Sequence, residues 1–313
     1  MTQFVIRRLL WVIPTMLAVA TIVFFVMHVV AGDPAVAILG DYASAQSLAD
    51  LRAKLGLDRP LWAQYFSYMG ELFRGHLGHS LINNKPVASY IMGLLPYTVK
   101  LAVAGMTLGI IIGIPLGILT ALRARTVVDY IGRILALMGL SMPAFYLGML
   151  LLLVFAVKLR WFPVISVARS PGVLNDLRTL FLPALSLGLI KAAFVSRMTR
   201  AAMLEVVRED FIQTARAKGL REHTVLYKHA LRNALIPVVT VIGIYMGALL
   251  GGAVLTETVF NRPGIGKLLV GALHQRDYPV IQSTLMIFTG FVVFVNLTVD
   301  LLYGLIDPRI RYE

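Results

Sequence analysis

The sequence contains no cysteine and few charged residues. Without a Cys among its 313 residues, the chain cannot form disulfide bonds, use a thiolate nucleophile or hold a metal through thiolates. Only 14% of the residues are charged, whereas 58% are hydrophobic, and the mean hydropathy is +0.79. A soluble core of this length cannot hide so much apolar surface, so we expect lipid to surround much of the chain.

A complete nucleotide-binding motif is also missing. Gly264, Gly266 and Lys267 resemble part of a phosphate-binding loop, but Asn261 and Leu268 stand where a Walker motif needs Gly and Ser or Thr. We therefore expect ATP to bind to another chain. The formal net charge of +13 does not predict nucleic-acid binding, because the basic residues are scattered among loops without a stacking aromatic pattern.

The sequence shows no catalytic or metal-binding arrangement. The closest pair of histidines, His76 and His79, has no carboxylate at a spacing that suits a metal site. No grouping of Ser, His and a carboxylate indicates a nucleophile, and no His-Glu-x-x-His motif indicates a membrane protease. We predict that the chain uses no metal or cofactor and is not an enzyme.

Six stretches of the sequence are long and apolar enough, at about 20 residues each, to cross a bilayer as helices. They cover residues 9–30, 101–122, 134–157, 180–196, 233–256 and 278–299. We predict an all-α polytopic membrane protein with six transmembrane helices in a single domain, residues 1–313. Pro115 and Pro143 are expected to kink the spans that contain them.

The orientation is predicted from the basic residues. Arg7 and Arg8 precede an apolar run about twice as long as the h-region of a signal peptide, so we expect a retained first span with a cytoplasmic N-terminus. Six spans then return the C-terminus to the cytoplasm, together with residues 197–237, which contain eight Lys and Arg residues. The basic residues within 158–178 favour the opposite orientation.

Residues 31–96 are too polar to span a membrane and too patterned for a linker. The spacing of apolar residues in 47–55 predicts a short amphipathic helix that ends at Gly56. We expect this segment to form a small extracytoplasmic cap. Its aromatic residues are expected in the core of the cap or in an interfacial belt, with a partner surface as the alternative. They are Trp62, Tyr65, Phe66, Tyr68 and Phe73.

Glycines recur along one face of two predicted spans. The first series is Gly105, Gly109, Gly113 and Gly117, and the second is Gly243, Gly247, Gly251 and Gly252. Faces of this kind let helices approach closely. We expect packing within one bundle, and packing against a second copy or a paralogous subunit is the alternative.

The polar segment 197–237 is rich in helix-forming residues. We predict one helix over 201–218 and another over 221–234, with Gly219 as the C-terminal cap of the first and Lys218 in its last turn. Two short helices with a tight corner would form a knob for a soluble partner. An amphipathic hairpin on the membrane surface is the alternative.

Lys191 carries a charge half-way along a predicted span. Such a charge usually faces a bundle interior or a water-filled cavity, so Lys191 is a candidate residue of a translocation path. Snorkelling of its ammonium group to the interface is the alternative. Glu257 and Asp300 lie near span ends, where we expect them to cap helices or pair with loops.

The stretch Thr214-Ala215-Arg216-Ala217-Lys218-Gly219, followed by Ile236-Pro237, resembles the Glu-Ala-Ala loop of ATP-binding-cassette (ABC) importer permeases. The form is that of the dipeptide, oligopeptide and nickel branch, although Gln213 and Thr214 stand where Glu and Ala are usual. The likeness extends over nearly the whole chain, through residues 7–10, 32–34, 203–210, 257–266, 276–279 and 300–311. It points to the first of the two paralogous permeases of such importers.

This resemblance implies a type I ABC importer permease fold, with both termini cytoplasmic, in a bacterial inner membrane. The implied partners are a second permease, two ATP-binding subunits and an extracytoplasmic solute-binding protein. The implied solute is a dipeptide, an oligopeptide or a similar small molecule. The residues implied to couple the permease to the ATP-binding subunits are Thr214, Ala215, Lys218, Gly219 and Leu220.

Two other functional classes are weaker alternatives. An ion-coupled secondary transporter that works alone would need intramembrane carboxylates, and the predicted spans place only Lys191 at mid-membrane depth. A membrane-embedded enzyme would need a catalytic set, which the sequence does not provide.

Overall fold

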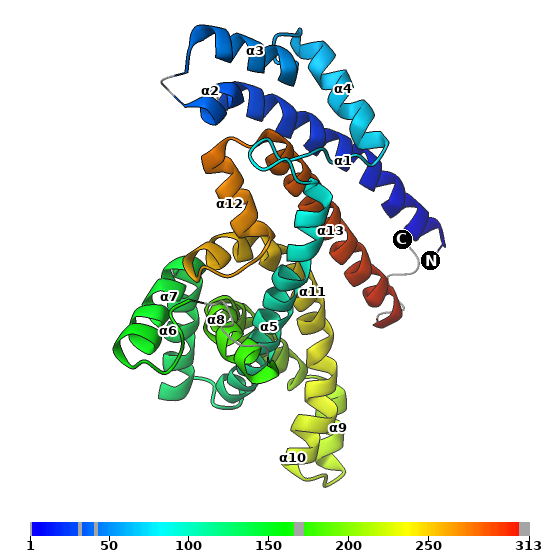
Figure 1. Ribbon diagram of the computed structural model, residues 1–313. Coiled ribbons are helices and arrows are strands. Elements are labelled where there is room, and N and C mark those ends of the chain that lie inside the picture. Colours follow the sequence, from blue (N-terminus) through cyan, green and yellow to red (C-terminus); the bar gives the residue numbers. More distant parts are fainter. Residues whose placement is uncertain (1, 31–32, 41–42, 166–171, 307–313) are drawn as a thin grey trace. The chain divides into compact units, whose positions relative to one another are not determined.

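The computed structural model describes residues 2–30, 33–40, 43–165 and 172–306, and almost all of this part is helical (Figure 1). It contains no strand in these ranges beyond an isolated bridge between His79 and Pro86. This confirms the all-α prediction. The chain divides into two compact units, one of Met1–Tyr97 with Pro263–Phe294, the other of Thr98–Arg262 with Val295–Glu313.

The first unit contains the N-terminal helices and the segment that was expected to form a cap. Its helices are α1 (Thr2–Val30), α2 (Pro34–Leu39), α3 (Ala45–Leu55), α4 (Leu61–Phe73), α12 (Ile265–Gln275) and the first parts of α5 (Val87–Leu122) and α13 (Tyr278–Ile306). The Ser44 side chain caps α3 by accepting a hydrogen bond from the Ser47 N–H, and Gly56 ends it with φ 69°. The short helix predicted before Gly56 is confirmed.

The second unit is built around a long buried helix. This is α8 (Val173–Val206), which packs against α6 (Val127–Ser141), α7 (Ala144–Leu151) and α11 (Leu231–Val259). The remaining elements are the rest of α5, the π-helices η1 (Leu152–Lys158) and η2 (Val225–Ala230), and the short helices α9 (Asp210–Ala217) and α10 (Glu222–Thr224). Its last residues come from the end of α13.

Five helical segments in the described residues are long and apolar enough to cross a membrane. They are Leu10–His28, Val87–Leu122, Val173–Val206, Glu222–Val259 and Tyr278–Val299. A sixth span is counted only if Val127–Ser141 and Ala144–Lys158, which meet at an angle of 106°, are taken together.

Two prolines predicted to kink their spans differ in effect. Pro143 lies at the sharp bend between α6 and α7, because it cannot donate the backbone hydrogen bond that would continue α6. The predicted span over 134–157 is therefore bent at Pro143, as expected for this proline, and consists of two helices. Pro115, in contrast, lies inside α5, which continues through it without a break.

The glycine face of α5 packs directly on α8. A Cβ atom on Gly113 would lie 2.8 Å from the Ala192 carbonyl oxygen, and one on Gly117 would lie 2.6 Å from the Ser196 carbonyl oxygen. These distances leave no room for a side chain, so the predicted packing within one bundle is confirmed for this face. The second series is less uniform, because a Cβ on Gly251 would meet nothing within 4 Å.

A methyl group at position 117 should therefore destabilise the second unit. In Gly117→Ala the new Cβ would press on the backbone of α8, which cannot move aside as a flexible side chain could, so we expect a loss of about 1–3 kcal/mol. Gly93→Ala, on the same helix but with nothing within 4 Å of its Cβ, is the matched control. Thermal unfolding of the purified proteins in detergent measures the difference, and equal midpoints for the two variants would contradict the packing.

Candidate functional site

The polar segment between α8 and α11 folds as a helical corner, which we define as residues 210–224. The segment does not contain the single helix predicted over 201–218, since α8 ends at Val206 and α9 starts again at Asp210. Glu209 and Asp210 explain the new start, because negative charge is favoured at a helix N-terminus. After the corner, helix continues from Glu222 through the π-turn η2 into α11.

Gly219 makes the sharp turn of the corner. Its φ of 75° lies in the left-handed region, and its N–H donates to the Arg216 carbonyl oxygen at 2.9 Å. The next N–H, of Leu220, donates to the Ala215 carbonyl oxygen at 3.4 Å. This pair of bonds is a Schellman motif, which closes a helix with Gly at the left-handed position. The prediction that Gly219 caps the first helix is confirmed.

An ion pair bridges the turn. The Arg216 guanidinium donates from Nη2 to Oε1 of Glu222 at 2.8 Å and from Nε to Oε2 at 3.2 Å. This pairing raises the pKa of Arg216 above its ordinary value. The two helices of the corner are thus joined by a fork of charge-assisted bonds as well as by the chain itself.

The residues implied by the resemblance lie on two different faces of the corner. Ala215 is only 8% exposed and packs in the core of the second unit with Ile212 and Val225. Its small side chain therefore serves the internal packing of the corner. Thr214, Lys218, Gly219 and Leu220 are exposed, with 42% of Leu220 open to the surroundings. Phe211 and Tyr227, which the resemblance did not single out, are 43% and 46% exposed on the same segment.

A buried ion pair near the end of α8 was not predicted from the sequence. Asp129, whose side chain is 1% exposed, accepts hydrogen bonds from Nε and Nη2 of Arg200 at 2.7 and 2.8 Å. The Arg125 N–H donates to the same carboxylate at 2.9 Å. The pair ties the start of α6 to α8, six residues before α8 ends. An acidic residue in the first turn of an apolar helix was the only signal in the sequence, and nothing in the spacing linked it to Arg200.

Lys191 lies in the middle of α8, apart from the corner, and faces α11. Its Nζ is 4.9 Å from the ring centroid of Tyr245 and 5.7 Å from that of Phe194. The two rings are themselves 4.5 Å apart. A half-buried ammonium over two aromatic faces is stabilised by cation–π attraction. This places the Lys191 ammonium between its own helix and α11 of the same unit.

Glu257 was expected at a span end, where it would cap a helix or pair with a loop. The structure buries it completely in α11, and its Oε1 accepts a hydrogen bond from the Thr98 hydroxyl at 2.6 Å. The bond joins α11 to α5 within the second unit. Asp300, the other carboxylate expected at a span end, lies in α13, and its side chain is outside the described residues.

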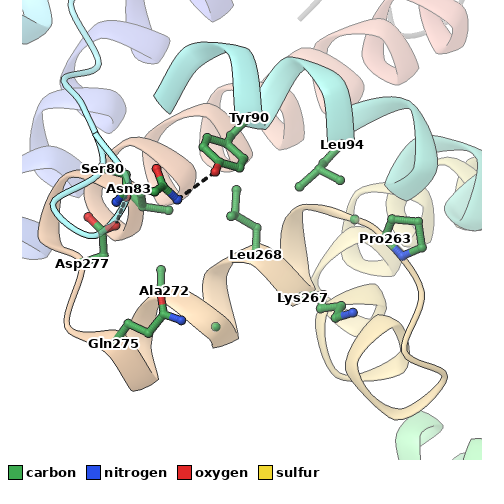
Figure 2. A pocket seen from close by; sticks show the side chains of 13 residues that line it. Ser80, Asn83, Tyr90, Leu94, Pro263, Lys267, Leu268, Ala272, Gln275 and Asp277 are labelled. Atoms are coloured by element: carbon green, nitrogen blue, oxygen red, sulfur yellow. Dashed lines mark hydrogen bonds between the residues drawn. The ribbon is translucent and has the colours of Figure 1, made fainter. Parts of the chain in front are cut away.

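A pocket of about 340 Å³ lies in the first unit, between the start of α5 and α12 (Figure 2). The Asn83 side-chain amide donates to the Tyr90 hydroxyl at 2.8 Å, and Leu94 and Leu268 line the pocket with apolar side chains. The Asp277 carboxylate accepts hydrogen bonds from the Ser80 hydroxyl at 2.5 Å and the Leu81 N–H at 3.1 Å. It therefore fixes residues 80–81 against the start of α13. The pocket is amphiphilic and has the size of a small-molecule site.

His76 has a carboxylate partner, contrary to the expectation from spacing. Its Nδ1 lies 2.9 Å from Oε2 of Glu71, because the chain turns sharply after α4 ends at Phe73. The hydrogen bond to His76 lowers the pKa of Glu71 below its ordinary value. Over the described ranges, however, the structure contains no group of three His, Cys, Asp or Glu side chains that could hold a metal ion.

Comparisons with known proteins agree along the whole chain. The family model described as "Binding-protein-dependent transport system inner membrane component" matches residues 113–312. A second model, described as "Binding-prot-dependent transport system membrane comp, N-term", matches residues 1–102. The first match includes the corner and the end of α5, and the second includes α1 to α4 and the start of α5.

Relatives that match this chain over their whole length are permease proteins. The dipeptide transport system permease protein DppB of Alkalihalophilus pseudofirmus is 43% identical, and the match covers 100% of both chains. The glutathione transport system permease protein GsiC of Escherichia coli is 42% identical, again over 100% of both chains.

Solved structures with a similar fold belong to ABC transporters. An inward-facing form of the methionine ABC transporter MetNI has a TM-score of 0.57 at 18% identity and covers 69% of this chain and 95% of that chain. An amino acid ABC transporter has a TM-score of 0.53 at 15% identity, covering 71% of this chain and 94% of that chain. At these identities the likeness is one of fold.

Proposed function

This chain belongs to the family of binding-protein-dependent transport system inner membrane components, and we propose that its importer carries short peptides or similar small solutes. It is a multi-pass permease subunit of an ABC importer in the inner membrane, a transport component and not an enzyme. The resemblance to importer permeases of the peptide branch is thereby confirmed, together with the helical importer fold.

The similarity to two peptide permeases carries the proposal for the solute. One relative is named for dipeptide and the other for glutathione, and the chain is nearly equally identical to both over its full length. Both solutes are short peptides with free carboxylates. We therefore propose a solute of this class.

An ABC permease works with ATP-binding and other transporter subunits. In the arrangement we propose, the chain pairs with a paralogous permease, two ATP-binding subunits and an extracytoplasmic solute-binding protein. Residues 197–237 and both termini would face the cytoplasm, and residues 31–96 would lie mainly outside.

The corner is our proposed contact with an ATP-binding subunit. Exposed Leu220 and Phe211 offer an apolar surface, and Lys218 adds a charge beside it. The Schellman turn and the Arg216–Glu222 pair support this role, because they hold the exposed tip in one shape. ATP-driven closure of the ATP-binding subunits would then move the corner as a rigid body and shift the permease pair between inward and outward states.

Lys191 is our proposed contact for the solute on its path. Lys191→Met is expected to lower uptake of a dipeptide several-fold, because it removes an ammonium that could attract a carboxylate. The same change should affect a peptide with an amidated C-terminus much less. Lys100→Met, on a lysine that pairs with Asp176 at 3.4 Å, is the matched control. Equal losses for both peptides, or loss of subunit assembly, would make Lys191 a structural residue.

Affinity purification of the tagged chain from its native membrane separates the importer from the ion-coupled alternative. We expect a protein with Walker motifs to co-purify in a stable complex, because the exposed corner needs a partner. Recovery of the chain alone, with transport activity driven by an ion gradient, would favour the secondary transporter.

A further inference from the structure

Helix α4 has an aromatic face that is left exposed by the described residues of the first unit. Trp62, Phe66 and Phe73 are 68%, 66% and 73% exposed. At the helical repeat of 3.6 residues they fall within about 40° of one another around the axis, so they form one stripe. Large aromatic side chains are seldom left in water as a continuous stripe, and such a surface normally marks an interaction site.

The neighbouring face of α4 packs on α1, a helix that is apolar enough to span the membrane. The Tyr65 hydroxyl is 2.9 Å from the Thr21 hydroxyl, and the Gln64 side chain is 3.0 Å from Nε2 of His28. Met69 packs with Ala20 in the same cluster of buried side chains. The two helices therefore run side by side in opposite directions (Figure 1).

The positions of these contacts along α1 place α4 beside the apolar segment that spans the membrane. Gln64 meets α1 at His28, the last residue of its apolar segment, whereas Met69 meets it at Ala20. Eight residues of helix correspond to about 12 Å, so α4 runs from the end of the span toward its middle. A helix that lay entirely in water would not accompany a membrane span over this length.

The exposed surfaces of the two helices are continuous. On α1, Ile22 and Phe25 are 61% and 46% exposed, as expected for the lipid-facing side of a span. The ring of Phe25 stacks on Tyr65 at 5.8 Å, and Tyr65 contacts Phe66 at 5.5 Å. The chain of rings leads from the lipid-facing side of α1 to the aromatic stripe of α4.

The remaining face of α4 is polar or small. Ser67 and Glu71 lie roughly opposite the aromatic stripe. Helix α4 thus has three faces: the aromatic stripe, the face that packs on α1, and a polar face. An apolar face opposite a polar one is typical of helices that lie in a membrane interface. Aromatic residues are enriched at that depth.

We propose that α4 is immersed in the outer leaflet beside α1, with Trp62, Phe66 and Phe73 in contact with lipid acyl chains. Part of the segment expected as an extracytoplasmic cap is then a membrane anchor. The inference goes beyond the transport role, because it concerns how the chain meets lipid and does not depend on the solute or the ATP-binding subunits.

The absence of cysteine makes the test direct. Phe66→Cys, Ser67→Cys and Ile22→Cys are each spin-labelled in the full importer complex, reconstituted in vesicles of phosphatidylethanolamine and phosphatidylglycerol. Collision rates with oxygen, which concentrates in lipid, and with a water-soluble nickel complex are then measured. We expect the label at 66 to resemble that at 22, with oxygen favoured, and the label at 67, one residue away on the polar side, to favour nickel.

Two outcomes would overturn the proposal. A label at 66 that favours nickel as strongly as the label at 67 would place the stripe in water. A label at 66 shielded from both reagents would show that protein covers the stripe.

Native Trp62 gives a second readout, because a cysteine could disturb the helix. The double variant Trp11→Phe/Trp161→Phe leaves Trp62 as the single tryptophan of this chain. Brominated lipid chains should quench its emission roughly twofold, as expected for an interfacial aromatic residue, and unchanged emission would contradict the proposal.

Discussion

Gly219→Pro is expected to abolish ATP-driven uptake while the chain still inserts in the membrane. Proline fixes φ near −65°, whereas Gly219 has φ 75°, and proline also lacks the N–H that donates to the Arg216 carbonyl oxygen. The Schellman turn cannot form, so the exposed tip at Lys218 to Leu220 points elsewhere. Because the change lies outside the apolar spans, insertion should not depend on it.

Gly219→Ala is the matched control for this prediction. A Cβ at position 219 meets nothing within 4 Å, so the only penalty is the left-handed backbone, about 1 kcal/mol. Uptake should remain near that of the native importer. Uptake, ATPase activity and retention of the ATP-binding subunits are measured for both variants in proteoliposomes. Normal uptake by Gly219→Pro would remove the corner from the coupling path.

Asp129→Ala is expected to destabilise the second unit more than any change in an exposed ion pair. It leaves the Arg200 guanidinium without the carboxylate that accepts two hydrogen bonds from it. Loss of one partner from a buried pair costs about 3–5 kcal/mol, and Arg200 is 22% exposed, so we expect roughly 3 kcal/mol. The link between α6 and α8 would loosen just before the corner.

A double-mutant cycle measures this interaction. Unfolding midpoints are compared for Asp129→Ala, Arg200→Ala and the double variant, and the double variant should be more stable than the sum of the single losses implies. Arg74→Ala, which breaks an exposed pair with Glu71, is the control and should change the midpoint little. Strictly additive losses at positions 129 and 200 would show that the bidentate pair contributes nothing of its own.

The apolar spans could be predicted because lipid imposes a simple rule on length and composition. Helices α1, α5, α8, α11 and α13 contain five of the six predicted spans. The sixth, over 134–157, consists of two helices that meet at 106°; the sequence indicated a bend at Pro143 but not its size, because hydropathy does not depend on backbone angles. The glycine face of α5 could also be predicted from the sequence, because small residues spaced four apart allow close helix–helix packing.

In the candidate site, the helix cap could be predicted from the sequence, whereas the tertiary contacts could not. Gly219 could be assigned as a cap because only glycine takes its φ readily. The burial of Ala215 depends on how α9 packs on η2, which sequence spacing does not reveal. Asp129 and Arg200 lie 71 residues apart, so their pairing could be found only from the folded chain.

The central claim is that this permease imports a short peptide with energy from ATP bound to other subunits. Uptake of labelled dipeptide into proteoliposomes tests it most directly, with the ATP-binding subunits and the solute-binding protein each present or omitted. The account predicts uptake only when ATP, the ATP-binding subunits and the binding protein are all supplied. Uptake by this chain alone, driven by an ion gradient, would contradict it.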